Sequence, residues 1–578
     1  MFMQENASSQ LELKMTVEIN IMVGGEAGQG VQSVGFLLAK ALTRWGYHVF
    51  ADQDYESRVR GGHNFFRVRA SDSPVEAITE NLDILIALNK ESIDLHRKEI
   101  KASGVVVYDG EKIPGLTGNG LINVPAERLA GESAGDALMS NTVALGAAFG
   151  LVGYDLQLLN ELLAEFFSGD TADKNVKAAN AGYQYVQGFA AAQKKLTHAG
   201  SDRRMLINGN EAMAIGAIAA GCKFISAYPM TPVTPIMEYF AARSEEFGLV
   251  LVPAEDEISA VNMVVGAAYT GVRAMTATSG GGFCLMVEGI GLAGMTETPI
   301  VVIEGQRPGP AIGLPTRTEQ GDLEFILHAS QGEFPRVVFA PATAGDCFQL
   351  TVEAFNLAEK YQLPVLIITD HYLANSYYTA DKFDLSKVNI DRGLLYTKNT
   401  ASGEYKRYAY TESGISPRAF PGNKDALVVA DSDEHDEAGH LIEDAETRKK
   451  MMDKRLGKLK GLKNVIIQPR FYGREKADTL LIGWGSTYGV IKEAVEMLTK
   501  TGGSYSHLHL NQIWPFPVEA VSAAMKNSRR SYVIENNATG QLAGLIRKET
   551  GLSANGSILK YDGRPFTPSI ILQELRKQ

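Results

Sequence analysis

The sequence has little cysteine: 578 residues contain only Cys222, Cys284 and Cys347. The three lie far apart and no Cys-x-x-Cys pair occurs, which excludes a disulfide framework and the usual spacing of a zinc site or an iron–sulfur cluster. No other residue set has metal-ligand spacing. Each cysteine has apolar or small neighbours, so we expect three buried free thiols in a protein from a reducing compartment.

Long apolar runs and an excess of positive charge are also lacking. No run of about 18 apolar residues could cross a membrane, and residues 1–14 are polar, without the apolar segment of a signal peptide. A net charge of -11 and a pI of about 5.6 argue against general affinity for nucleic acid or anionic membranes. We therefore expect a soluble, cytoplasmic protein with no nucleic-acid or membrane partner.

What the sequence does contain is a repeated alternation of short apolar strands, Gly-containing turns and amphipathic helices, which is typical of α/β folds. A chain of 578 residues is too long for one core and should form several domains. We expect α/β domains over residues 16–198, 204–395 and 469–578. Residues 396–468 have weaker periodicity and end in an acidic and then a basic run, which predicts a linker with a charged helix on the surface.

Three chemically specific loops recur in the second domain at the spacing of βα units. Tyr228-Pro-Met-Thr-Pro232 is a turn restricted by its prolines. Glu257 follows an expected strand at 249–252 and opens an apolar helix, with Glu255 as the second candidate. Thr276-Ala-Thr-Ser-Gly280 leads from a strand into a glycine-rich turn. Because the ends of parallel strands meet at one edge of a sheet, we expect these loops to share a ligand.

Each loop also has a structural interpretation that the residues alone leave open. Acidic residues favour the first turn of a helix whatever their function. A proline-punctuated turn likewise needs no ligand to explain it. The occurrence of all three loops in one domain favours a ligand-binding site.

Together these motifs resemble the pyrimidine-binding domain of thiamine diphosphate enzymes, and specifically the alpha subunit of the 2-oxoacid:ferredoxin oxidoreductases. The resemblance implies that Glu257 hydrogen-bonds the pyrimidine ring, so that the exocyclic amine of the cofactor can deprotonate the thiazolium carbon. It implies that the Thr231 hydroxyl points to the reacting carbon and the substrate. Tyr228, Pro229 and Ser279 are the other residues expected at the cofactor.

Two arginines near the expected site could bind carboxylates. Arg307, in Gly305-Gln-Arg-Pro-Gly309, resembles the family arginine that holds the carboxylate of the 2-oxoacid by paired hydrogen bonds. Arg317, in Pro315-Thr-Arg-Thr318, could hold a second carboxylate, or could pair with Glu319 or Asp322. The Arg317 segment and the order of the domains look most like the 2-oxoglutarate enzyme.

The N-terminal turn Gly24-Gly-Glu-Ala-Gly-Gln-Gly30 completes neither a dinucleotide fingerprint nor a P-loop. It does place backbone N–H groups at a helix start, which suits phosphate. With Tyr55-Glu-Ser-Arg-Val-Arg-Gly-Gly62, it resembles the gamma domain of the same family, implicated in coenzyme A binding. A purely structural turn is the alternative. The expected coenzyme A contacts are Gly28, Gln29, Gly30, Arg58 and Arg60.

The last domain resembles the transketolase C-terminal-like domain of the family, which serves assembly. The chain has no Gly-Asp-Gly, the family mark of the diphosphate and Mg²⁺ site. The resemblance therefore implies a beta subunit that carries this site and a [4Fe-4S] cluster. It also implies a dimer of alpha-beta heterodimers that reduces ferredoxin.

The implied reaction converts a 2-oxoacid, coenzyme A and oxidised ferredoxin into acyl-CoA, CO₂ and reduced ferredoxin, or runs in reverse as a carboxylation. Pyruvate and branched-chain 2-oxoacids are alternative substrates. A different alternative is a non-catalytic, dinucleotide-binding scaffold or regulator with Asp52 or Asp54 on the ribose. A self-sufficient transketolase-like enzyme is a third, which the missing Gly-Asp-Gly opposes.

Overall fold

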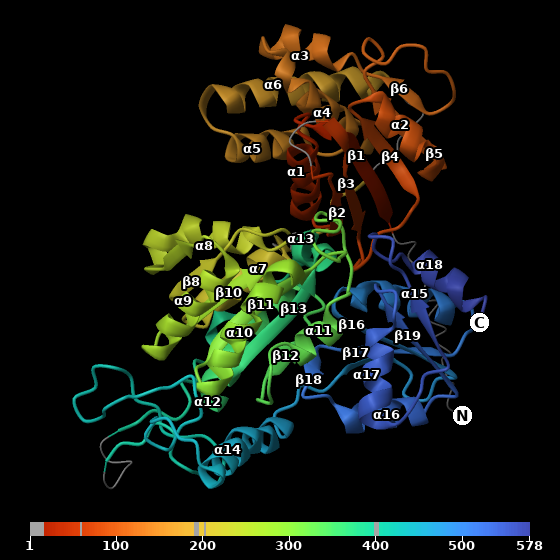
Figure 1. The fold of residues 1–578 in the computed structure, drawn as a ribbon. Helices are drawn as coiled ribbons and strands as arrows, with labels where there is room; N and C mark the ends of the chain where they lie inside the picture. Colours follow the sequence, from red (N-terminus) through yellow and green to blue (C-terminus); the bar gives the residue numbers. More distant parts are fainter. Residues whose placement is uncertain (1–16, 58–60, 190–195, 201–203, 398–403) are drawn as a thin grey trace, which may run out of the picture. The chain divides into compact units, whose positions relative to one another are not determined.

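The computed structural model describes residues 17–57, 61–189, 196–200, 204–397 and 404–578. Within them the chain forms two compact units (Figure 1). Unit 1 contains the residues up to Ala51, with 65–75 and 81–204. Unit 2 contains 52–64, 76–80 and 205–578, so two short N-terminal segments belong to it. No described helix is both long enough and apolar enough to span a membrane.

Unit 1 is built on a sheet with strand order β6-β5-β4-β1-β3-β2, in which β1, β4, β5 and β6 are parallel. The core of β1 is buried on both faces, as expected for an inner parallel strand. The strands are β1 (Glu18–Ala27), β2 (His48–Asp54), β3 (Gly61–Ser71), β4 (Leu82–Ala87), β5 (Ile100–Tyr108) and β6 (Leu121–Asn123). The helices are α1 (Val31–Arg44), α2 (Lys90–His96), α3 (Ala126–Ala134), α4 (Ser140–Val152), α5 (Leu156–Phe166) and α6 (Gly169–Tyr185).

The first turn of unit 1 is shorter than the sequence predicts. We expected the strand to end at Val23, but β1 continues to Ala27, and its pairing with β4 includes Gly24 opposite Ala87. Only Gly28, Gln29 and Gly30 form the turn. Gly28 and Gly30 have φ angles of 95° and 77°, which favour glycine.

Unit 2 contains a seven-stranded sheet of order β18-β12-β13-β11-β10-β8-β9, parallel except for β18. A short antiparallel pair, β7 and β14, belongs to the same unit. The strands are β7 (Met205–Asn208), β8 (Phe224–Ala227), β9 (Val250–Pro253), β10 (Ala274–Thr278), β11 (Ile300–Gln306), β12 (Val337–Phe339), β13 (Pro364–Asp370), β14 (Tyr377–Ala380) and β18 (Gln512–Trp514). The helices are α7 (Gly209–Ala219), α8 (Thr234–Phe247), α9 (Glu257–Tyr269), α10 (Gly280–Met295), α11 (Leu323–His328), α12 (Ala344–Tyr361) and α13 (His371–Asn375).

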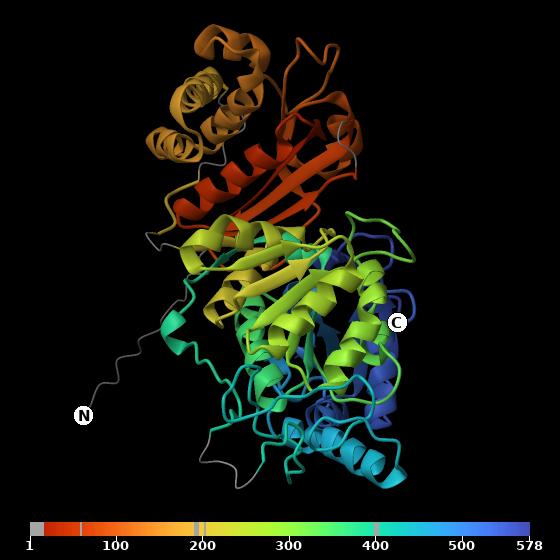
Figure 2. The same cartoon turned by 60° about the vertical axis from the view of Figure 1, so that its left-hand side comes forward.

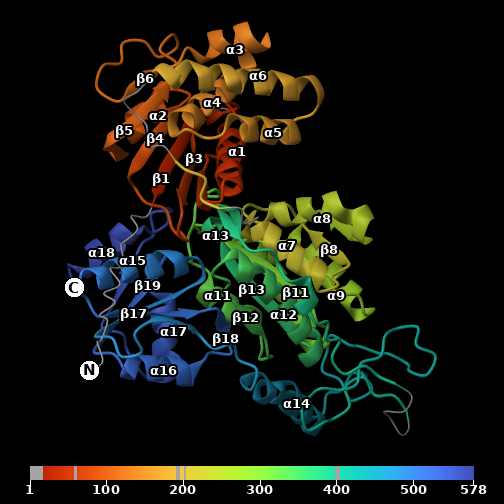
Figure 3. The same ribbon diagram turned by 180° about the vertical axis from the view of Figure 1, so that it is seen from behind.

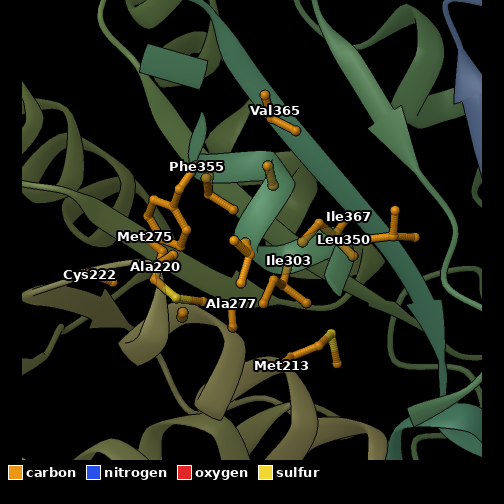
Figure 4. Packing of buried hydrophobic residues seen from close by; sticks show 14 of the residues in the cluster. Met213, Ala220, Cys222, Met275, Ala277, Ile303, Leu350, Phe355, Val365 and Ile367 are labelled. Atoms are coloured by element: carbon orange, nitrogen blue, oxygen red, sulfur yellow. The ribbon is translucent and has the colours of Figure 1, made fainter. Parts of the chain in front are cut away.

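Helices cover both faces of this sheet. Val301 and Ile303 point into a core formed with α7, α8 and α12, whereas Ile300 and Val302 point into a second core formed with α9, α10 and α11. Figure 3 shows the α7 and α12 side, and Figure 1 shows α10 and α11 from the opposite side. In the first core, Phe355 packs toward Met275 and Ala277 (Figure 4). Burial on both faces explains the nearly continuous apolar strands.

The C-terminal part of unit 2 forms a five-stranded sheet of order β15-β17-β16-β19-β20. Leu480, Ile482 and Trp484 of β16 join the core made with α9 and α10, so the two sheets share one core. The strands are β15 (Arg470–Gly473), β16 (Thr479–Trp484), β17 (Tyr505–Leu510), β19 (Arg530–Glu535) and β20 (Gly556–Leu559). The helices are α15 (Tyr488–Lys500), α16 (Val518–Lys526), α17 (Gln541–Thr550) and α18 (Pro568–Leu575).

The predicted charged helix exists as α14 (Ala445–Lys463), drawn in cyan in Figure 2, but it is not simply a surface helix. Lys454, Arg455 and Lys458 are buried along one face. The Lys454 and Lys458 ammonium groups bind the buried Glu297 carboxylate at 2.6 and 2.5 Å. Paired charges can be buried where isolated ones cannot, and charge pattern alone does not reveal the partner.

The expectation of three buried thiols is wrong for one cysteine. Cys222 and Cys347 are buried, but Cys284 is exposed. Cys284 shares the outward face of α10 with the exposed Gly281 and Glu288, one helical turn away in each direction. Small and apolar neighbours in the sequence therefore did not indicate burial.

Candidate functional site

The candidate site lies at one edge of the seven-stranded sheet, where neighbouring parallel strands end. The loop Tyr228–Pro232 follows β8, Ser279 follows β10, and Arg307 follows β11. Glu257 is the first residue of α9, which follows β9 at the edge of the sheet. This is the end of an open α/β sheet at which ligands generally bind.

Arg307 and Thr231 are in direct contact. The Arg307 side chain donates from Nη1 to the backbone carbonyl of Thr231 at 2.9 Å, and Arg307 is only 9% exposed. The next peptide is held by Asn210, a fully buried residue whose Nδ2 donates to the Pro232 carbonyl at 3.0 Å. The loop that carries Thr231 is thus fixed from both sides, and its hydroxyl makes no hydrogen bond to a described residue.

Glu257 and the β8 loop converge through Thr278 and Gly282. The Thr278 hydroxyl lies 3.9 Å from the Met230 sulfur. A Cβ atom on Gly282 would lie 2.1 Å from the Thr278 hydroxyl and 2.5 Å from Oε1 of Glu257. Only glycine therefore fits at this position, and its absence of a side chain leaves room for the carboxyl group.

The Glu257 carboxyl is buried without being paired. Its residue is 4% exposed, and its Oε1 has no hydrogen-bond partner among the described residues. The neighbouring Asp256 caps the helix, since its Oδ1 accepts from the Ser259 N–H at 2.7 Å. Glu255 is exposed. Structural capping is thus the role of Asp256, and of the two glutamates only Glu257 faces inward with an unused acceptor.

The other expected cofactor contacts differ in exposure. Ser279 is fully buried at the N-terminus of α10, and its hydroxyl has no partner among the described residues. Tyr228 and Pro229 are exposed at the end of β8. A buried hydroxyl and the open N–H groups of Gly280–Gly282 at a helix start form a polar lining for a ligand.

Two acidic residues near Arg307 were not predicted. Burial and the neighbouring Asp322 carboxyl raise the pKa of Glu304 well above its usual range, and burial also raises the pKa of Asp322. Burial lowers the pKa of Arg307, while Asp322 and Glu304 oppose that shift. Neither carboxyl group forms an ion pair with Arg307 within 4 Å, so the guanidinium keeps donors for a ligand. The sequence suggested Asp322 only as a partner of Arg317, five residues before it. No sequence motif indicated that Asp322 lies near Arg307.

Arg317 is held elsewhere in unit 2. Its Nη1 binds Oδ1 of Asp54 at 2.5 Å and the Tyr55 carbonyl at 3.0 Å, rather than Glu319 or Asp322. Asp54 also pairs with Arg564 at 3.3 Å. No described contact joins Arg317 to Thr231 or Arg307. The Nε and Nη2 groups of Arg317 make no hydrogen bond to a described residue.

Unit 1 has a pocket of about 310 Å³ at the carboxyl ends of β1, β4 and β5. Gly28 and Gln29 line it, and Gly30 is the N-cap of α1. Asp109, Glu127 and Asp136 give the lining more acid than base, with Lys112 the one cation. This composition suits an uncharged polar group better than a phosphate. Arg58 and Arg60 lie outside the described residues.

Three family models match the chain in sequence order. One, described as pyruvate ferredoxin/flavodoxin oxidoreductase, matches residues 20–185, and another, pyruvate flavodoxin/ferredoxin oxidoreductase, thiamine diphosphate-binding, matches 215–454. Core domain II of pyruvate:ferredoxin oxidoreductase matches 477–571. The multi-domain α/β fold class is thereby confirmed.

Curated relatives and a solved structure agree with these matches. A 2-oxoacid:ferredoxin oxidoreductase subunit alpha from Sulfolobus sp is 33% identical over 95% of both chains. The 2-oxoglutarate synthase subunit KorA of Methanothermobacter marburgensis is 32% identical over 64% of this chain and 97% of its own. The 2-oxoglutarate:ferredoxin oxidoreductase of Magnetococcus marinus superposes with a TM-score of 0.91 at 33% identity, covering 97% of this chain and 99% of the other. The relatives are subunits of larger enzymes, and this chain belongs to the family of 2-oxoacid:ferredoxin oxidoreductase alpha subunits.

Proposed function

We propose that the chain is the alpha subunit, with a fused coenzyme A-binding unit, of an enzyme that oxidatively decarboxylates 2-oxoglutarate to its acyl-CoA with reduction of ferredoxin, or runs the reverse carboxylation. The single observation that carries this proposal is the convergence of Thr231, Glu257 and Arg307 at one sheet edge. The choice of 2-oxoglutarate is supported by the Magnetococcus marinus enzyme, whose structure is described with 2-oxoglutarate, coenzyme A and succinyl-CoA bound.

The residues at the sheet edge fit the pyrimidine end of thiamine diphosphate. Glu257 offers a buried acceptor with no protein partner, beside the space that Gly282 leaves open. Ser279 offers a second buried group without a partner. When bound, thiamine diphosphate supplies the carbon nucleophile and the electron sink that decarboxylation of a 2-oxoacid requires.

The chain's own residues then have distinct tasks. Glu257 holds a proton between its carboxyl oxygen and the pyrimidine nitrogen, which is general acid–base work by a positioned carboxyl group. Arg307 binds the carboxylate of the 2-oxoacid through the N–H groups that Thr231 does not occupy. The Thr231 hydroxyl would face the reacting carbon when cofactor and substrate are bound, and its loop is held in place by Arg307 and Asn210.

Arg307 and Thr231 should affect different kinetic constants. Arg307→Ala should raise the KM for 2-oxoglutarate by about 10-fold or more, because a hydrogen bond to a charged group contributes about 1.5–3 kcal/mol. Thr231→Val keeps the shape of the side chain and should mainly lower kcat. Steady-state kinetics of the reconstituted enzyme separate the two effects. Unchanged kinetics in both variants would mean that the substrate binds elsewhere.

Arg317 is our proposed group for the distal carboxylate of 2-oxoglutarate. Its Nη1 is fixed by Asp54, which leaves the Nε and Nη2 donors oriented and unused. Asp54 pairs with both Arg317 and Arg564, so a dinucleotide scaffold that used Asp54 on the ribose would have to compete with two arginines.

Arg317→Gln should therefore change substrate preference. We expect the KM for 2-oxoglutarate to rise about 10-fold or more, since a charge-assisted hydrogen bond is lost, while kcat/KM for pyruvate stays within about twofold. Arg564→Gln is the matched control, because it also removes a partner of Asp54. Equal losses with both substrates, or the same change in the control, would assign Arg317 a structural role.

Coenzyme A is proposed to bind unit 1. The pocket beside Gly28 and Gln29 supports a site for its uncharged part, and Arg58 and Arg60 are proposed for its phosphates. Arg58→Ala combined with Arg60→Ala should raise the KM for coenzyme A by about 10-fold or more. CO₂ release without coenzyme A should be unchanged. An unaltered KM with lower thermal stability would make both arginines structural.

The proposed partners are a beta subunit, ferredoxin and a second alpha-beta pair. Mg²⁺, the diphosphate site and a [4Fe-4S] cluster are assigned to the beta subunit, because this chain lacks Gly-Asp-Gly and paired cysteines. Free thiols support a cytoplasmic location.

Substrate identity is tested by coenzyme A-dependent dye reduction with purified alpha and beta subunits. We expect kcat/KM for 2-oxoglutarate to exceed the values for pyruvate and for branched-chain 2-oxoacids. A preference for pyruvate would retain the reaction but overturn the substrate assignment.

A further inference from the structure

A pocket of about 310 Å³ in unit 2 lies away from the sheet edge that carries Thr231 and Arg307. Arg336 lines it and stands just before β12, at the amino end of a parallel strand, whereas the candidate site lies at the carboxyl ends. The pocket also involves residues of α11, β18, α14 and α17, which are all labelled in Figure 1.

The walls of this pocket are apolar. Leucines from three helices line it together with two aromatic residues. The Arg336 guanidinium lies 4.4 Å from the centre of the Phe334 ring. The apolar lining consists of Leu327, Phe334, Leu456, Leu459, Trp514 and Leu545.

Arg336 is a buried cation without a carboxylate partner. It is 6% exposed, and its one hydrogen bond to a described residue runs from Nη1 to the Ile326 carbonyl at 3.1 Å. Burial lowers the pKa of Arg336 to about 10, and no acidic neighbour counters that shift, so the group is still charged at neutral pH. By contrast, the buried Arg273 and Arg418 both pair with Glu359. A buried charge ordinarily needs a counter-ion.

The rim adds positive charge. Lys548 is exposed at the pocket, and its Nζ lies 3.4 Å from Nε2 of His328 and 4.0 Å from Oε1 of Glu549, which does not line the pocket. Glu333, the one acidic residue in the lining, is exposed and forms no ion pair with Arg336. The described lining thus has an unpaired cation at its base and a lysine at its mouth.

We propose that this pocket binds a small organic anion with an apolar, preferably aromatic, body. The anionic group binds the free N–H groups of Arg336, and the body packs against Phe334 and Trp514. A charge-assisted hydrogen bond supplies the missing counter-ion, and burial of the apolar body stabilises the complex. Inorganic phosphate satisfies only the charge, so we expect it to bind more weakly.

Two fluorescent probes that differ in one group test the proposal on the assembled enzyme. 8-Anilinonaphthalene-1-sulfonate carries an anion, and N-phenyl-1-naphthylamine is the same body without it. We expect Arg336→Gln to weaken sulfonate binding by about 10-fold or more and to change binding of the neutral probe by less than about twofold. Lys548→Gln, which changes an exposed residue, should weaken binding of the sulfonate probe by a few-fold and leave binding of the neutral probe unchanged.

Leu456→Trp, which fills the pocket, should abolish saturable binding of both probes. Trp514→Phe should reduce energy transfer to the bound sulfonate, because Trp514 lines the pocket, whereas Trp484, buried in the core against which Trp514 packs, and Trp45 of unit 1 do not line it. Neither variant should alter the KM for the 2-oxoacid. Undiminished sulfonate binding in Leu456→Trp, or equal losses of both probes in Arg336→Gln, would overturn the proposal. If Arg336→Gln does not fold, the Lys548 and Leu456 variants decide the question.

Discussion

Replacement of Glu257 by glutamine is expected to leave the alpha subunit folded and assembled but to lower turnover by about 10²–10⁴-fold, the usual contribution of a general acid–base group. Glutamine keeps the size of the side chain but cannot exchange a proton with the pyrimidine nitrogen. The buried Oε1 of Glu257 has no described protein partner, so the substitution breaks no hydrogen bond at that atom. Stopped-flow and steady-state assays of the reconstituted enzyme measure the loss.

Glu255→Gln is the matched control two residues away. Glu255 is exposed, so this variant should keep activity within about twofold, as surface substitutions usually do. Activity close to wild type for Glu257→Gln, together with an inactive Glu255→Gln, would move the role to Glu255. If both variants are inactive and their circular dichroism spectra are those of an unfolded chain, the loop that carries the two glutamates has a structural role.

The largest effect on stability is expected at Glu297, which follows α10 and anchors α14. Burial alone would raise the pKa of Glu297, but Lys454, Lys458 and Arg407 hold it well below the usual range. Glu297→Gln leaves two buried ammonium groups without their counter-ion. Breaking a buried ion pair in this way costs about 3–5 kcal/mol in the free energy of unfolding.

Denaturant unfolding of the alpha chain measures this cost. Glu446→Gln is the control, because it removes an exposed i,i+4 pair with Lys450 and should change the free energy of unfolding far less. Adding Lys454→Met and Lys458→Met to Glu297→Gln should recover part of the loss, since the charges are removed together. A Glu297→Gln variant as stable as the Glu446 control would show that the buried cluster contributes little.

The difference in unfolding free energy between the wild type and Glu297→Gln should depend on pH in a defined direction. Because the folded state lowers the pKa of Glu297 from 4.5, its contribution is fully present above pH 4.5 and is lost as the pH falls toward the folded-state pKa. The stability gap between the wild type and Glu297→Gln should therefore shrink below pH 4.5. A gap that widens on acidification would contradict the ion-pair explanation.

Much of the fold could be predicted from local patterns. The apolar runs at 299–303 and 363–369 became β11 and β13, because inner parallel strands are apolar on both faces. The helix expected directly after the turn Gly24–Gly30 is α1, which begins at Val31 and ends at Arg44. The three loops of unit 2 could be predicted to lie together because parallel strands end at a common edge.

The remaining features depend on contacts between distant segments. The partners of Arg317 are more than 260 residues away in the sequence, and the pairing of Lys458 with Glu297 spans 161 residues. Charge patterning cannot reveal which charges pair when the chain folds. The same holds for Asn210, whose support of Pro232 no motif indicates.

The central claim is that Thr231, Glu257 and Arg307 form half of a catalytic site that a beta subunit completes. The most direct measurement is reduction of ferredoxin by 2-oxoglutarate and coenzyme A, with thiamine diphosphate and Mg²⁺, using the purified alpha chain alone, the beta chain alone, and both together. Activity should appear only with both chains, and should fall by about 10²–10⁴-fold when the alpha chain carries Glu257→Gln. Full activity of the alpha chain alone, or of the pair with Glu257→Gln, would contradict the claim.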